Sequence, residues 1–398
     1  MKRPRTKHFL SFLYILIFAA LAFLFFTNDF GILDLRKTSV VIGVAIDVEE
    51  DDVVLTAQLA VPQPAENGEN TQFNVVTGTG ATVAAALNEV NVKTGFYPKL
   101  VFCKLILLGE SCFAEDITKL LDYFYRNEYT GLTLNVAACQ GKASEVLGQQ
   151  FPCGNSATDV IDKLLSAEAK ASGNVSAATI KELGEGLYSP SASAYMPYLE
   201  NGIVEKGEDE SGGGESGGGG GGSGGQSSQC EESELVCNRC AIFSNGYCQG
   251  VLSKEQTFVF NLIKNDVKHA FLKAGEGEDT CVLGLRSCKG DVGLKFEQGT
   301  PVLNFKFTAT AKVQDSQDGF HPQNIESGGV NDDDLKLGQD QVTAMFNSLF
   351  ESVKTLGCDV LNLKNMMYKS NYDKYDQFSE NLYECLTVTS EVKLKSAE

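Results

Sequence analysis

The sequence predicts a protein of mixed α/β (α+β) class whose first helix spans a membrane. Three observations lead to this prediction. Residues 9–26 form an almost unbroken apolar run, β-branched runs alternate with amphipathic segments over residues 38–150, and long helical patterns flank an alternating strand near the C-terminus. The chain beyond residue 38 is long enough for several domains, each with its own core.

The apolar run is long enough to cross a bilayer. At about 1.5 Å per residue, a helix over residues 9–26 reaches ~27 Å, close to a hydrocarbon core of about 30 Å. Four basic residues precede it: Lys2, Arg3, Arg5 and Lys7. Residues 1–8 are therefore expected to be a cytoplasmic tail, and the chain beyond residue 30 to lie outside the membrane. The alternative is a cleaved secretory signal, because Ala20-Leu21-Ala22 is a small-x-small tripeptide, although the run exceeds a usual signal core.

The composition limits the partners. The chain carries a net charge of −19 and lacks the clustered Lys and Arg that a phosphate-binding surface needs, so no nucleic-acid partner is expected. The same acidity disfavours a broad docking surface on anionic lipid.

The twelve cysteines are too sparse for a disulfide scaffold. Four of them fall between residues 230 and 248, where Cys237-Asn-Arg-Cys240 superficially resembles a zinc or redox pair. A zinc ribbon needs two close pairs and this segment has one, and Cys240 runs straight into the strand-like Ala241-Ile242-Phe243. A local disulfide or free thiols are therefore favoured over zinc or redox chemistry.

The predicted N-terminal domain covers residues 38–150. Ser39–Val48 and Val53–Val61 form a hairpin across the acidic turn Glu49–Asp52, followed by a strand at Gln72–Gly78 and a helix at Thr82–Val92. The glycines before this helix are interpreted as a turn and cap, because the motifs of a phosphate-binding loop are incomplete. The remaining elements expected here are Val101–Leu108 (strand), Phe113–Arg126 (helix), Leu132–Ala138 (strand) and Ala143–Gln149 (helix).

The predicted middle domain covers residues 151–272. It holds helices at Ala157–Ala167 and Ala177–Leu187, an extended Ser193–Leu199 and a strand at Leu235–Phe243. Between these strands lies a loop, residues 207–234, that is expected to be disordered because eleven of the fourteen residues 212–225 are glycine. The loop is either a linker between domains or an overgrown loop within one domain, which loop-closure entropy permits.

The predicted C-terminal domain covers residues 273–398. Before it, Ser253 caps a helix that begins near Glu255. The expected elements are strands at Cys281–Ser287, Val292–Glu297 and Val302–Val313, helices at Asp333–Leu356 and Val360–Lys369, and a closing strand at Leu386–Leu394.

No catalytic constellation emerges from the residues. The three histidines, His8, His269 and His321, are too few and too far apart for a metal site or a triad. The motif H-E-x-x-H is absent from the sequence, while G-x-S-x-G occurs only inside the glycine tract and S-x-x-K only at Ser390–Lys393 in the expected closing strand, neither of which is a catalytic context. The protein is therefore not expected to be an enzyme, and no catalytic, cofactor-binding or metal residue is nominated.

Several segments resemble the Ger(x)C family of spore germination proteins. They are Val41–Asp47, Thr77–Thr82, Leu120–Asn127 and Gly141–Leu147 in the first half, and Ala241–Ser253 in the second. Members of that family are usually lipoproteins, but this chain has no cysteine before Cys103. Lipidation is therefore excluded, and the uncleaved helix over residues 9–26 is expected to replace it as the anchor.

The resemblance implies the C-type subunit of a spore germinant receptor, on the outer face of the spore inner membrane beside other membrane-bound receptor subunits and without a cofactor. In the family a short loop joins strands like 194–199 and 235–243, which favours the overgrown loop here. We expect a non-catalytic interaction subunit whose docking anchors are among Tyr123, Tyr125, Tyr368 and Tyr372. The alternative is an exported enzyme or a stand-alone solute-binding module.

Overall fold

The computed structural model describes residues 5–27, 38–61, 72–149, 151, 156–202, 234–275, 280–316 and 330–397. Helix α1 (Arg5–Thr27) comes first, and its side chains are described over residues 12–23. Nine large apolar side chains on this part of α1 are exposed. Within the described residues, no helix is both long enough and apolar enough to cross a membrane.

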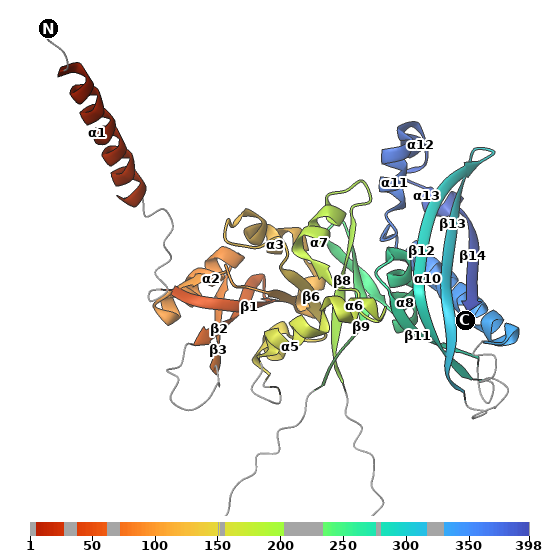
Figure 1. Cartoon of the computed structure of the whole chain (residues 1–398). Helices are drawn as coiled ribbons and strands as arrows, with labels where there is room; N and C mark the ends of the chain where they lie inside the picture. The colour runs from red at the N-terminus through yellow and green to blue at the C-terminus, as the bar shows by residue number, and fades with distance from the viewer. Residues whose placement is uncertain are drawn as a thin grey trace, which may run out of the picture.

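The chain then builds a ten-stranded mixed sheet, in the order β10-β9-β8-β6-β5-β1-β2-β3 (Figure 1). Its strands are β1 (Thr38–Glu49), β2 (Asp52–Val61), β3 (Gln72–Gly80), β4 (Tyr97–Lys99), β5 (Leu105–Leu108), β6 (Asn135–Cys139), β7 (Ala178–Thr179), β8 (Ser193–Gly202), β9 (Glu234–Ser244) and β10 (Tyr247–Leu252). The central strands β1, β5, β6 and β8 are parallel, and antiparallel strands flank them on both sides. Short β4 runs parallel to the start of β1, and β7 pairs with β6.

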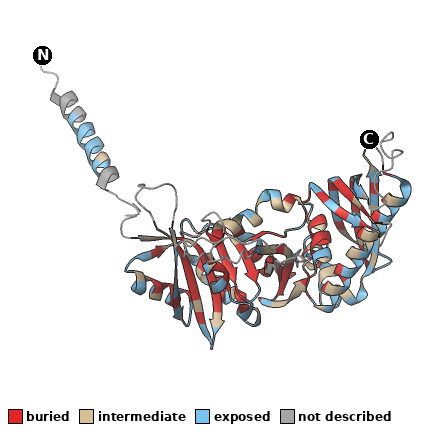
Figure 2. Cartoon of the chain, turned by 90° about the horizontal axis from the view of Figure 1, so that it is seen from below, coloured by how far each residue is buried: buried red, intermediate tan, exposed pale blue. Residues whose placement is uncertain are grey.

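Helices cover both faces of this sheet. α2 (Val83–Thr94), α3 (Ile117–Arg126) and α7 (Ile180–Leu187) pack into one hydrophobic cluster, whereas α4 (Ala143–Gly148) and α5 (Ala157–Leu164) pack into another. β1 is apolar on both faces for this reason: Val44 and Ile46 belong to the first cluster and Ala45 to the second. Figure 2 shows the buried strands between these layers. The short helices η2 (Glu110–Ala114) and α6 (Ala167–Ala171) complete the unit.

A second sheet, in the order β11-β12-β13-β14, forms the other core. Its strands are β11 (His269–Ala274), β12 (Cys281–Glu297), β13 (Thr300–Ser316) and β14 (Thr387–Ser396), with β14 parallel to β13. The helices around it are α8 (Lys254–Lys264), α10 (Asp332–Thr355), α11 (Leu363–Ser370), α12 (Tyr372–Phe378) and α13 (Leu382–Cys385). Its hydrophobic cluster includes Cys240 and Ile242 of β9, so the two sheets share a packed boundary.

The Gly-rich segment joins two neighbouring strands. β8 and β9 pair as antiparallel strands up to Gly202 opposite Glu234, at the point where the described chain stops on both sides. The segment is therefore an insertion in one hairpin, as the overgrown-loop interpretation predicts. The expected disorder of residues 207–233 lies outside the described residues, and residue 234 already belongs to β9.

The predicted domain limits fall at identifiable places. Along the chain, the limit between residues 150 and 151 comes after β6 and before β7, and both of these strands belong to the ten-stranded sheet. The limit between residues 272 and 273 falls inside β11. The structure groups the chain by its two sheets, and the division at 38–150, 151–272 and 273–398 stays a prediction.

Most predicted elements are confirmed, but several boundaries are wrong. The strand predicted from Val101 begins at Leu105, because residues 100–103 form a turn closed by a hydrogen bond from Cys103 N to Leu100 O. The helix predicted from Phe113 begins at Ile117, where the side chain of Asp116 accepts from Thr118 N as the cap. The two strands predicted over residues 281–297 are one bulged strand, β12. β11 was not predicted.

Candidate functional site

The carboxylate of Asp47 is buried near the end of β1 and caps helix α4, which begins 96 residues later in the chain. Its two oxygens accept hydrogen bonds from Ala143 N at 2.8 Å and Ser144 N at 2.9 Å, at the start of α4. Gly109 leaves the necessary space, because a Cβ atom there would lie 2.0 Å from Asp47 Oδ1. Two segments of the family resemblance thus meet in the fold, and the acid is held for a structural purpose.

Asp359 plays the same part in the second core. It accepts from Leu363 N at 2.9 Å, from Lys364 N at 2.8 Å and from the hydroxyl of Tyr383 at 2.5 Å, and so caps α11. Its own N–H donates to Ser193 Oγ at 3.0 Å, which ties α11 to the start of β8. Burial raises the pKa of Asp359. All of these donors are internal, so this acid also stabilises the fold.

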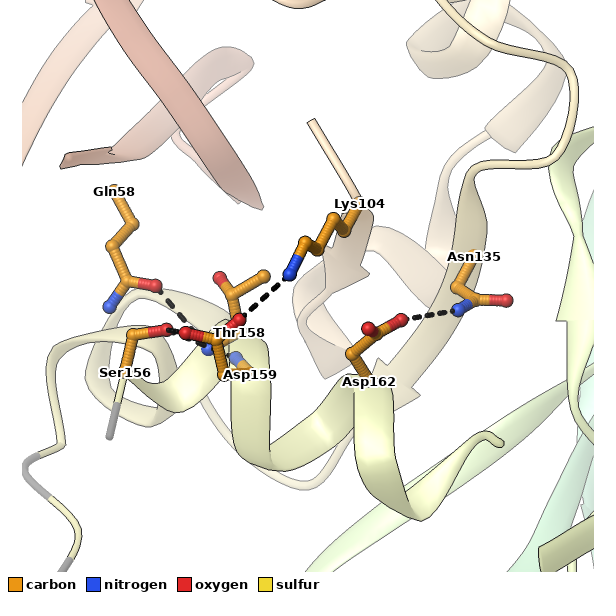
Figure 3. A network of polar contacts seen from close by, with 7 residues as sticks. All are labelled: Gln58, Lys104, Asn135, Ser156, Thr158, Asp159 and Asp162. Atoms are coloured by element: carbon orange, nitrogen blue, oxygen red, sulfur yellow. Dashed lines mark hydrogen bonds and ion pairs between the residues drawn. The ribbon is translucent and has the colours of Figure 1, made fainter. Parts of the chain in front are cut away.

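A polar network attaches α5 to one edge of the first sheet (Figure 3). It comprises Gln58, Lys104, Asn135, Ser156, Thr158, Asp159 and Asp162. Lys104 Nζ lies 2.9 Å from Asp159 Oδ1, and Asn135 donates to Asp162 at 3.0 Å. The hydrogen bond to Asp159 raises the pKa of Lys104. Each carboxylate is already engaged by a donor from the sheet, so the network holds the helix in place and offers no free acid/base pair.

The thiols of the Cys237-x-x-Cys240 segment are separated and buried. Cys237 lies in the cluster under α4 and α5, whereas Cys240 lies in the cluster of the second sheet. Burial raises the pKa of Cys237 to about 12 and also raises that of Cys240. Metal binding and thiol exchange both use the thiolate, which these positions disfavour. Within the described chain, no three His, Cys, Asp or Glu side chains could hold a metal ion.

A hollow of about 500 Å³ lies on the second sheet, over β11, β12 and the end of β13. Its lining includes Lys268, His269, Phe271, Gly284, Arg286 and Gln314. Two of these side chains, Lys268 and Arg286, are basic, which suits a small anion. Phe271 is 68% exposed, however, and His269 and Arg286 are exposed as well, so the hollow is open to solvent. It lacks the enclosure of a usual small-molecule site.

The four predicted docking anchors separate into two pairs. Tyr123 and Tyr125 lie on α3 and are half-buried against the first core. The hydroxyl of Tyr125 donates to Ile180 O at 2.9 Å, and that of Tyr123 accepts from Asn127 Nδ2 at 2.9 Å. Tyr125 thus ties α3 to the start of α7, whereas Tyr123 bonds to the residue that ends α3 itself, and a docking role for either stays a prediction.

Tyr368 and Tyr372 are exposed and lie together. They are 47% and 59% exposed, and their ring centroids are 5.6 Å apart. Tyr375 completes the group, with its ring 5.2 Å from that of Tyr368 and 6.0 Å from that of Tyr372. This tyrosine cluster (Tyr368, Tyr372, Tyr375) sits where α11 ends and α12 begins.

Neither capping acid was predicted from the sequence. Asp47 directly follows the apolar stretch Val44–Ile46, which is a usable signal, but the helix that it caps is far along the chain. Asp359 follows no such stretch, and the helix that it caps begins a turn later. His269 lies exposed on β11, while the side chains of His8 and His321 lie outside the described ones.

Comparison with known families places the chain clearly. Residues 32–201 match the family described as the spore germination protein N-terminal domain, and residues 238–396 match the one described as spore germination B3/GerAC like, C-terminal. No curated protein matches the chain. A solved structure titled as the crystal structure of the GerBC protein is 14% identical, with a TM-score of 0.49, covering 89% of this chain and 96% of that one. The two family matches together cover most of the chain, so the chain belongs to the Ger(x)C family of spore germination proteins.

Proposed function

We propose that this protein is the membrane-anchored C-type component of a spore germinant receptor, acting as a non-catalytic interaction subunit in spore germination. Membership of the Ger(x)C family carries this proposal. The internal roles of the buried acids and thiols support the non-catalytic part, because these groups already have partners or are held in their neutral form.

The proposed anchor is the apolar run over residues 9–26, with a cytoplasmic tail at residues 1–8 and the rest of the chain on the outer face of the spore inner membrane. The basic residues before the run support this orientation. The exposed apolar side chains of α1 support it too, since they would be costly in water and favourable in lipid. Tethering would raise the effective concentration of the chain near its partners, so that weak contacts suffice.

The tyrosine cluster is the proposed docking site for other membrane-bound receptor subunits. Tyrosine is enriched among the residues that dominate interface energies, because its ring is large and its hydroxyl tolerates partial exposure. Three tyrosines in mutual contact on two capped helices form a rigid group, which loses little conformational entropy on binding.

Co-purification from spore membranes in mild detergent tests this function. The wild-type chain should bring down other receptor subunits, and a Tyr368→Ala, Tyr372→Ala double variant should lose them. Tyr247→Ala is the matched control, because Tyr247 is 44% exposed but lies on β10, away from the cluster. Recovery of the wild-type chain alone, or equal recovery of partners by both variants, would refute the docking role.

Orientation can be tested through Cys385, which is exposed. A membrane-impermeant maleimide added to intact membranes should label the wild-type chain more than a Cys385→Ser variant. No difference between the two chains, with a difference appearing only after the membrane is opened, would reverse the proposed topology.

The open hollow on the second sheet is where the alternative function, a stand-alone solute-binding module, would reside. Calorimetric titration of the purified chain with small carboxylates and phosphates tests it. Tight binding that is lost in an Arg286→Ala variant would favour that alternative over the receptor subunit.

A further inference from the structure

Exposed apolar side chains are concentrated in one short part of the chain. Beyond α1, fourteen large apolar side chains are exposed among the described residues, and six of them fall within the 37 residues from Phe96 to Leu132. They are Phe96, Tyr97, Val101, Phe102, Tyr129 and Leu132. Tyr97, Phe102 and Leu132 are each more than half exposed. Burying such side chains is favourable, so this concentration indicates a contact surface.

The topology brings these six residues to a single edge of the first sheet. They lie at the starts of β4, β5 and β6 or just before them, and all three strands run parallel to β1 or to each other. β4 pairs with the first residues of β1, β5 follows it along the same side of β1, and β6 begins level with β5, so the segments follow one another at the end of the sheet where β1 begins. Lys99 links two of them, because its Nζ lies 4.5 Å from the ring centroid of Tyr129 and 5.3 Å from that of Tyr97.

The same edge receives the chain that comes from α1. Thr38, the first residue of β1, pairs with Tyr97 of β4. Eleven residue steps separate Thr38 from Thr27 at the end of α1, so a fully extended chain would span at most about 40 Å. In Figure 1, the start of β1 lies at one end of the molecule and α11 and α12, which carry the tyrosine cluster, lie towards the other.

We propose that this edge, the anchor-proximal edge formed by the six residues above, rests in the interface of the lipid bilayer that holds α1. The proposal rests on the proposed function only through the anchor. Tyrosine favours the level of the lipid headgroups, because its ring is apolar and its hydroxyl can face water, while phenylalanine and leucine insert just below that level. Lys99 sits over two tyrosine rings, where its ammonium can reach lipid phosphates while its stem covers apolar surface.

The anchor makes this contact effective. An isolated patch of six partly exposed side chains would bind lipid weakly, but the tether keeps it within about 40 Å of the surface, so the contact becomes intramolecular. The contact would fix the orientation of the first sheet and leave the tyrosine cluster free to meet partner subunits.

Single tryptophan probes test the proposal, because the chain contains no tryptophan. The full-length Phe102→Trp and Leu132→Trp variants are reconstituted into phosphatidylcholine vesicles with or without brominated acyl chains. Phe271→Trp is the matched control, since Phe271 is 68% exposed but lies on β11 of the second sheet. Groups buried about 5–10 Å into the interface come within reach of the bromines, so the first two probes should lose at least about half of their fluorescence.

Brominated lipid should leave the Phe271→Trp control nearly unchanged. Equal quenching of all three probes, or quenching of Phe102→Trp and Leu132→Trp no stronger than that of the control, would overturn the proposal. Flotation of the vesicles after an alkaline carbonate wash reports separately on the anchor. A chain that stays with the vesicles but shows no selective quenching refutes the lipid contact alone, whereas a chain that washes off refutes the proposed anchor.

Discussion

Replacing Asp359 with alanine should destabilise the second core and helix α11 together. The substitution removes the cap of α11, which costs about 0.5–2 kcal/mol. It also leaves the buried N–H of Leu363 without an acceptor, and an unsatisfied buried donor costs about 1–3 kcal/mol. The backbone N–H of Lys364 and the hydroxyl of Tyr383 also lose their acceptor, but both residues are only partly buried, so water can partly replace it. We therefore expect a loss of about 3 kcal/mol in the free energy of unfolding.

Urea unfolding of the detergent-solubilised chain, followed by circular dichroism, measures this loss. Asp359→Asn should cost less than Asp359→Ala, because an amide oxygen can still accept one of the hydrogen bonds. Asp373→Ala is the control, since Asp373 is exposed in the first turn of α12 and its loss should stay below about 1 kcal/mol. A loss below about 1 kcal/mol for Asp359→Ala would refute the capping argument.

The pH dependence gives an independent check on Asp359. Burial raises the pKa of this carboxyl above its ordinary value, so the folded chain holds the proton more tightly than the unfolded chain. The contribution of this group to stability is therefore present below its unfolded pKa and is lost as the pH rises through the folded pKa. Asp359→Asn should remove that part of the slope, and an unchanged slope of stability against pH would contradict the assignment.

Three further predictions concern other parts of the fold. Deleting residues 212–225 shortens the β8–β9 connection from 31 residues to 17, which should change the free energy of unfolding by only about 0.5 kcal/mol, and a loss of several kcal/mol in urea unfolding would show that the tract packs on the fold. Gly78→Ala should cost about 1–3 kcal/mol, because its Cβ would lie 2.2 Å from a carbonyl oxygen of α2, whereas Gly148→Ala, with nothing within 4 Å, should cost nothing in the same assay. A thiol reagent should modify Cys385 at once but Cys240 only on unfolding, and fast modification of Cys240 would contradict its burial.

The sequence predicted the elements whose signals are local. The β1–β2 hairpin shows β-branched runs around an acidic turn, and α2 follows a threonine that does cap it, with Thr82 Oγ1 accepting from Ala85 N. The glycines before α2 were also interpreted correctly as structural, because Gly78 lets the helix lie against β3. β11 was missed although its residues alternate between buried and exposed, a period that could have predicted it.

The surfaces were harder to predict, because exposure depends on distant parts of the chain. Val101 and Phe102 extend the apolar run of β5, so their residue types predict a buried strand, whereas they lie exposed in a turn. Tyr123 and Tyr368 are the same residue type in similar helical patterns, and only the fold distinguishes the half-buried one from the exposed one. Residue type alone therefore could not locate the exposed aromatic side chains.

The position of β1 has a mechanical consequence. This strand lies inside the sheet, between β2 on one side and β4 and β5 on the other, and the chain from α1 joins it at its first residue. A pull through that junction acts along the strand, so it loads the hydrogen bonds on both sides in shear, and they must yield together. An edge strand pulled in the same direction would be held by hydrogen bonds on one side alone. The chain from α1 thus joins the sheet at a strand that is held on both sides against a pull along its own axis.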